Sequence, residues 1–208
     1  MKIKRFLFIF FISILTFSCS DELSKLTFPL ETPDDITDED YLIYSLVIDE
    51  LYNSSSIVIK QKTGITFNET DFSEYLYEYF ENSENAKNIS SETLSNYYSL
   101  NQTPFYFDNK FSCKNKEVLL ISNEELNAIF NENTSEDIDK SWEKYYSKYD
   151  KSNGFMSFTK IGYNNSKTQA IFEIHHSYES LGASTSIIYL EKEGENWVLK
   201  DTLIYLTS

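Results

Sequence analysis

The spacing of hydrophobic residues along the chain changes once, near residue 155, from a helical period to an alternating one. Before that point apolar side chains recur every three or four residues, as they do on one face of a helix. This pattern predicts helices over 37–52, 70–80, 91–98, 122–130 and 135–149. Two short apolar runs, 56–60 and 117–121, predict strands between these helices, the first because of its β-branched residues.

Polar residues mark where two of the predicted helices begin. Thr37-x-x-Asp40 and Ser122-x-x-Glu125 both fit a capping box, in which the first and fourth side chains bond to each other's backbone N–H groups. The cleanest helical stripe belongs to the second helix and consists of Phe72, Tyr75, Leu76, Tyr79 and Phe80. The aromatic segment 105–111 fits either a strand or an irregular arm.

After residue 155 the alternation predicts four strands, 155–163, 168–177, 185–192 and 196–206. Polar residues at 164–167 and 193–196 favour hairpin turns, so the strands form an antiparallel meander. A longer connection, 178–184, joins the middle pair, and Gly154 ends the preceding helix.

Helices first and strands last indicate an α+β fold. We expect a single domain over 39–208, in which a helical part, 39–150, packs on a four-stranded antiparallel sheet, 155–206. A cystatin-like or NTF2-like cone, with helices against a curved sheet, is one specific form, and it rests on analogy alone.

The first 18 residues have the layout of a secretory signal. Basic residues at positions 2, 4 and 5 precede an apolar run, 6–17, that is too short to span a bilayer. The run closes on Leu-Thr-Phe-Ser-Cys at 15–19, which resembles a bacterial lipoprotein signal, although Thr16 stands where Leu, Val or Ile is more usual. The resemblance implies cleavage before Cys19 and acylation of that cysteine, which attaches the protein to a membrane. An ordinary secretory signal with a coincidental cysteine is the alternative.

The segment 19–38 is expected to be an acidic tether that is extended and mobile, because it has two prolines, many acids and no hydrophobic period. Ser20-Asp21-Glu22 is similar to the short acidic tag that sends some Bacteroidota-type lipoproteins to the outer face of the outer membrane. This similarity implies an outer-membrane or cell-surface location. A solvated linker that begins with two acids is the alternative.

Two longer stretches carry a family resemblance. One is 44–62, where a helix runs into Ile57-Val58-Ile59 and a polar turn, and the other is 142–201, from Trp142-x-x-Tyr145-Tyr146 to Trp197-Val198-Leu199. Both resemble uncharacterised lipoproteins of Bacteroidota type. The resemblance implies a fold and a location, and it implies no activity.

Charge narrows the classes of partner. The chain has 33 acidic against 18 basic residues and a net charge of −15. Such a surface repels nucleic acid and anionic lipid headgroups, so the membrane partner is reached through the lipid on Cys19 and not through surface charge. With Cys19 acylated, Cys113 has no partner for an internal disulfide, and stability must come from a core built on sixteen Tyr and sixteen Phe.

His175 and His176 are the only histidines. Adjacent residues of a strand point to opposite faces, so this pair cannot chelate one metal ion, and no metal or cofactor site is predicted. Glu173 shares a face with His175 and could form an acid–base dyad or a weak metal site there. A solvated pair on Glu173 and His175, and a partly buried, hydrogen-bonded His176, are the plainer interpretations.

No catalytic motif accompanies these residues. The chain has no Gly-x-Ser-x-Gly elbow, no His-Glu-x-x-His and no glycine-rich phosphate loop. Tyrosines on the predicted helices would suit a surface that recognises a protein or a glycan, or else they line the core. The sequence therefore favours a lipid-anchored envelope lipoprotein with a non-enzymatic binding or accessory role. A pocket-bearing enzyme or small-ligand binder that uses Glu173 with His175 or His176 is the alternative.

Overall fold

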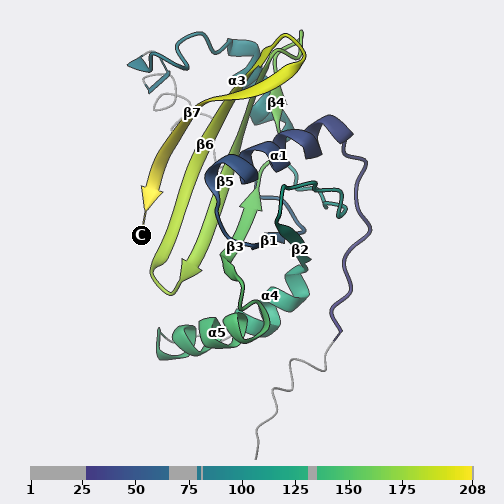
Figure 1. Ribbon diagram of the computed structural model, residues 1–208, viewed down its shortest axis with the longest axis vertical. Helices are drawn as coiled ribbons and strands as arrows, with labels where there is room; N and C mark the ends of the chain where they lie inside the picture. Colours follow the sequence, from purple (N-terminus) through teal and green to yellow (C-terminus); the bar gives the residue numbers. More distant parts are fainter. Residues whose placement is uncertain (1–26, 66–78, 81, 131–134, 208) are drawn as a thin grey trace, which may run out of the picture.

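The structure, a computed structural model, describes residues 27–65, 79–80, 82–130 and 135–207 (Figure 1). Within these ranges helices lie on both faces of one seven-stranded sheet, which confirms the α+β class. The leader, 1–18, and the first part of the predicted tether lie outside the described residues. The predicted helix 70–80 also lies outside them, apart from its last two residues, which are helical.

The strands of the sheet occur in the order β2-β1-β3-β5-β6-β7, and β4 pairs with β5. Their bounds are Ser56–Lys60 (β1), Glu117–Ile121 (β2), Ser152–Phe158 (β3), Gly162–Tyr163 (β4), Gln169–Glu179 (β5), Gly182–Glu193 (β6) and Asn196–Thr207 (β7). Strands β3 to β7 pair only in antiparallel fashion among themselves, as the alternation predicts. The predicted first strand is divided into β3 and β4.

The prediction of a purely antiparallel, four-stranded sheet is wrong in two respects, because within the described residues the sheet has seven strands and two of its strand pairs are parallel. Strand β1 lies between β2 and β3 and is parallel to both, with Ile59 opposite Leu120 on one side and Met156 on the other. Parallel strands are joined by long connections, so the sequence contains no hairpin turn that would indicate their pairing. The segment predicted as the helical part therefore supplies two strands to the sheet.

Helix α1 (Asp38–Leu51) covers one face of the sheet, and α3 (Ser91–Leu100), α4 (Asn123–Phe130) and α5 (Ser135–Lys148) lie on the other (Figure 1). The alternation within strands decides which residues meet which helix. Phe172 packs with Tyr44 of α1, whereas its neighbour Ile171 packs with Tyr97 of α3. The cluster around Tyr97 is called the α3 cluster below.

The sheet face that α3 covers has a second hydrophobic cluster, which lies under α4 and α5. We call it the α5 cluster. Its strand residues include Val58 of β1 and Phe155 of β3, and Tyr145 of α5 is its fully buried centre. The α3 cluster contacts β5, β6 and β7, so the two clusters occupy different parts of the same sheet face.

The predicted capping box of α1 is confirmed. The Thr37 Oγ1 accepts a hydrogen bond from the Asp40 N–H (3.2 Å), and the Asp40 carboxylate accepts one from the Thr37 N–H (3.3 Å). At α4 the Ser122 Oγ likewise accepts from the Glu125 N–H (3.1 Å). The Glu125 carboxylate, however, accepts from the Tyr149 hydroxyl (2.8 Å) and thereby joins α4 to the end of α5.

Three smaller expectations change. The segment 105–111 is an irregular arm, with a single β-bridge between Lys62 and Tyr106. Gly154 lies within β3 and not at the end of α5; its φ is +73, and a Cβ there would lie 1.9 Å from the Ser177 carbonyl oxygen, so only glycine fits. The connection between β5 and β6 is only two residues long.

The described end of the predicted tether is fastened to the domain. The Glu31 N–H donates to the Gln61 side-chain oxygen (2.8 Å), and the Asp34 N–H donates to the Tyr106 carbonyl (2.9 Å). Ile36 is buried in the core below α1. Phe28 packs against the α5 cluster, so the described part of the tether contacts the domain, and mobility of the preceding residues stays a prediction.

No helix in the described part of the chain combines the length and the apolar character that a membrane span requires.

Candidate functional site

His176 and His175 point to opposite faces of β5. His176 lies on the α1 face with 7% of its surface exposed, where its Nε2 contacts the Asn153 carbonyl and its ring meets Tyr52 edge-on at 5.5 Å. Burial lowers the pKa of His176, and the contact with the carbonyl opposes that shift in part. His176 is therefore a neutral residue of the core.

His175 and Glu173 share the other face, with α3 and α5. The two ring nitrogens of His175 contact hydroxyls: Nδ1 lies 2.8 Å from Thr185 Oγ1, and Nε2 lies 3.2 Å from Ser177 Oγ. The Glu173 carboxylate accepts a hydrogen bond from the Tyr97 hydroxyl on α3. In an acid–base dyad the carboxylate would orient the histidine ring. Here two hydroxyls orient the His175 ring, and the Glu173 carboxylate bonds to Tyr97 instead.

His175 belongs to a line of polar side chains that crosses four neighbouring strands. Ser157 of β3 is opposite His175 in the register, and Thr185 of β6 is opposite His175 on its other side. Strands β1 and β3 are parallel, and Ile59 is opposite Met156. The next residues along the two strands, Lys60 and Ser157, therefore lie side by side. We call these four residues, Lys60, Ser157, His175 and Thr185, the polar row.

The polar row lies between the two apolar clusters of its face. On β5 the row is flanked by Glu173 toward one end, with Ile171 of the α3 cluster beyond it, and by Ser177 toward the other, opposite Phe155 of the α5 cluster. Lys60, Ser157 and His175 are half-buried, and Thr185 is buried. Water can therefore reach part of the row.

Lys60 and Ser157 have unused polar groups. Among the described residues neither the Lys60 ammonium nor the Ser157 hydroxyl has a hydrogen-bond or ion-pair partner. Three other partly buried lysines are paired with a carboxylate: Lys116 with Asp49 (2.7 Å), Lys192 with Glu39 (2.8 Å), and Lys148 with Glu125. Burial lowers the pKa of Lys60, and the charge of Lys62 lowers it further.

The positive charge of Lys60 reaches His175. Burial lowers the pKa of His175, and repulsion by the positive charge of Lys60 lowers it further. The polar row thus combines a cation with hydroxyl and imidazole groups in a protein whose net charge is strongly negative. The sequence holds a signal for Lys60. It is a charged residue at the end of an apolar run, and alternation along the strand places it on the same face as the buried Val58.

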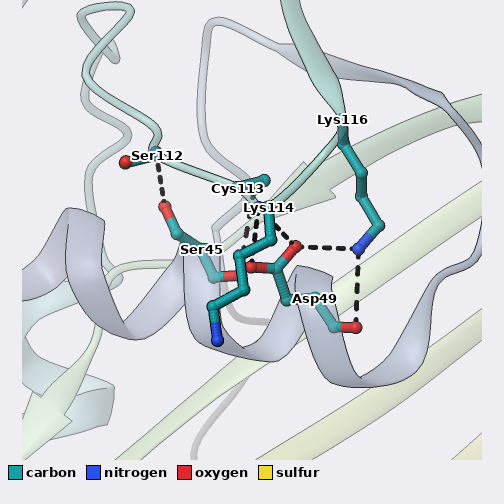
Figure 2. A network of polar contacts seen from close by, with 6 residues as sticks. All are labelled: Ser45, Asp49, Ser112, Cys113, Lys114 and Lys116. Carbon is teal, nitrogen blue, oxygen red and sulfur yellow. Dashed lines mark hydrogen bonds and ion pairs between the residues drawn. The ribbon is translucent and has the colours of Figure 1, made fainter.

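Cys113 lies on the opposite side of the molecule, beside α1 (Figure 2). Its Sγ contacts the Ser45 carbonyl at 3.8 Å, and burial raises the pKa of its thiol, which lowers its reactivity. The Asp49 carboxylate next to it accepts from the Lys114 N–H (2.9 Å) and from the Lys116 ammonium. These contacts fasten the segment 112–116 to α1, so Cys113 belongs to a structural network.

The tyrosines expected on helix surfaces are largely in the core. Those of α3 and α5 that are buried, with at most 8% of their surface exposed, are Tyr97, Tyr98 and Tyr145, together with Tyr149 just after α5. Tyr79 and Tyr146 are half-buried, and Tyr75 and Tyr77 lie outside the described residues. The described tyrosines therefore fit the core interpretation and do not form a recognition surface.

No three His, Cys, Asp or Glu side chains gather into a metal-binding group within the ranges that the structure describes. Comparison of the chain with protein-family models, with curated proteins and with solved structures finds no match in any of the three. The arguments about function below therefore rest on the residues themselves.

Proposed function

We propose that the chain is an envelope lipoprotein, held at the outer membrane or cell surface by acyl chains on Cys19, whose domain has a binding or accessory role. The observation that carries the proposal is the leader, in which basic residues and an apolar run end at Ser18-Cys19. Several acyl chains on one cysteine give lasting attachment. The acidic residues Asp21 and Glu22 support an outward-facing location.

Binding is favoured over catalysis because of how the candidate residues are engaged. Tyr97 binds the Glu173 carboxylate, hydroxyls bind both nitrogens of His175, and His176 is buried on the other face. A protein or a glycan is the partner class that the proposal includes, and the net charge of −15 disfavours nucleic acid.

The proposal also includes a specific form of the fold, a cystatin-like or NTF2-like arrangement. It is supported by α1, whose Tyr44 packs against Phe158 of β3 and Phe172 of β5 in the cluster that also holds Ile188 of β6. The parallel strands β1 and β2 would be additions to that form.

The experiment for the anchor compares the wild-type chain with Cys19→Ala, each made in a Gram-negative host. We expect a diacyl or triacyl mass increment on wild type, with the protein in the membrane fraction, and loss of both in the variant. Cys113→Ala is the matched control and keeps both. A soluble, unmodified wild-type product cleaved elsewhere would refute the lipoprotein proposal.

A second candidate function is supported by the polar row. A small ligand that binds over Ser157 and His175 would meet a cation and free hydroxyl capacity on a half-buried surface. This candidate needs no lipid anchor and is tested separately below.

A further inference from the structure

We propose that the polar row binds a small oxyanion, the carboxylate, sulfate or phosphate group of a ligand, over Ser157 and between Lys60 and His175. This inference rests on the second candidate function and names its ligand class. It does not depend on acylation of Cys19.

The first argument is the unused bonding capacity at adjacent positions. An ammonium group has three N–H donors and a serine hydroxyl has one, and oxyanions accept such bonds more strongly than neutral acceptors do. Lys60 and Ser157 lie side by side on neighbouring strands, and no described residue bonds to either side-chain group. An oxyanion would satisfy both groups together.

The second argument is the cost of the unpaired cation. A half-buried ammonium loses part of its hydration, and a carboxylate normally compensates for that loss. Asp49 and Glu39 do so for Lys116 and Lys192. Among the described residues no carboxylate pairs with the Lys60 ammonium, although the chain contains 33 acidic residues.

The geometry of the strands sets the size of the ligand group. Neighbouring strands lie about 4.8 Å apart, so Lys60 and His175, two strands apart, are separated by about 10 Å at their backbones. A single oxyanion over Ser157 fits within that width. Thr185 and Ser177 are positioning residues, because their hydroxyls hold the His175 ring on either side.

Glu173 is the acidic group nearest to the row along β5, two residues from His175. Its carboxylate is bound by Tyr97 on the side of α3, but its negative charge still opposes an anion. The two charges therefore predict effects of opposite sign. Removal of the Lys60 charge should weaken anion binding, and removal of the Glu173 charge should strengthen it.

The experiment is isothermal titration of the purified protein with phosphate, sulfate and acetate at constant ionic strength. We expect Lys60→Met to weaken binding about tenfold or more, the usual effect of losing a charge-assisted hydrogen bond. Glu173→Gln should tighten binding. Lys110→Met is the control, since it makes the same change of charge beside Tyr41, on the α1 side of the sheet.

A stability measurement separates a ligand site from a structural role for Lys60. Methionine removes a desolvated charge and keeps the length of the side chain, so Lys60→Met should be as resistant to urea as wild type, or more so. Ser157→Ala is the second variant and should also weaken binding. Equal affinity of wild type and Lys60→Met, or no heat of binding at tens of millimolar anion, would overturn the proposal whatever the result for Cys19.

Discussion

At the scale of single residues, a close approach between α3 and the sheet depends on Gly162. A Cβ at this position would lie 2.4 Å from the Tyr97 Cβ and 2.6 Å from the Tyr97 backbone nitrogen. These atoms belong to the body of α3 and cannot rotate away. A side chain at 162 would therefore push α3 off β4.

The substitution Gly162→Ala tests this contact. We expect the free energy of unfolding to fall by about 1–3 kcal/mol, the usual cost of overpacking, in urea titrations followed by circular dichroism. Gly64→Ala is the matched control, because its Cβ would lie 3.6 Å from the nearest atom, and it should change stability by less than about 0.5 kcal/mol. Equal losses in both variants would contradict the steric explanation.

Single residues also show the limit of sequence analysis at the candidate site. The alternation along β5 is enough to place Glu173 and His175 on one face and His176 on the other. It cannot supply their partners, since Tyr97 reaches Glu173 only after α3 has docked on the sheet. Lys60 joins the row only because β1 pairs in parallel with β3.

At the scale of elements, the acidic first turn of α1 attaches this helix to the sheet. The Glu39 carboxylate accepts hydrogen bonds from the Lys192 ammonium (2.8 Å) and the Trp197 indole N–H (3.0 Å), and the Lys192 bond lowers the pKa of Glu39. The next residue, Asp40, binds the Tyr163 hydroxyl of β4. The same turn therefore caps the helix, complements its dipole and contacts three strands.

A prediction for this element concerns Thr37, the N-cap residue. Thr37→Ala removes the side-chain oxygen that accepts from the Asp40 N–H, and we expect a loss of about 1 kcal/mol in the free energy of unfolding. Thr103→Ala, at an exposed position without a side-chain hydrogen bond to the described residues, is the control. If both variants unfold at the wild-type urea concentration, the cap does not contribute to stability.

Elements were more predictable than their pairing. The bounds of α1, α3 and α5 follow from spacing and caps, and the hairpin of β6 and β7 follows from the polar turn at 193–196, whereas the sequence predicts a longer connection in place of the short turn between β5 and β6. The place of β1 does not, because parallel pairing joins segments distant in the chain and depends on the global packing. The half-formed capping box at Glu125 has a similar cause, since contacts with α5 take its carboxylate.

At the scale of the whole molecule, one sheet face is covered by α1 and the other by two separate helical clusters. The polar row lies on the second face, between strand residues of the two clusters, and none of its four residues belongs to either cluster. The four residues of the row are polar side chains at half-buried or buried positions of the sheet, and departures from an apolar pattern are expected where a protein binds something. The edge strand β7 has two irregularities in its register with β6, a feature that natural sheets use to keep edge strands from pairing with other chains.

The two histidines, on opposite faces of this sheet, predict how the stability of the whole domain depends on pH. Burial lowers the pKa of both below the ordinary value of 6.5, so the unfolded chain binds protons at a higher pH than the folded one. The free energy of unfolding must then fall as the pH decreases below about 6.5, by about 1.4 kcal/mol for each unit of pKa difference. Glu39 and Asp49 have lowered pKa values, so their contribution to the free energy of unfolding is lost only when the pH falls below their ordinary pKa values of 4.5 and 3.8.

The two windows can be separated by urea titrations at a series of pH values. His176→Gln keeps a hydrogen-bond donor near the Asn153 carbonyl and removes the titration, so it should flatten the part of the decline that begins below about pH 6.5. His175→Gln should flatten the remainder, while the loss of stability below about pH 4.5 persists in both variants because it belongs to the carboxylates. A decline that keeps its wild-type slope in the double variant would mean that groups other than the buried histidines take up the protons.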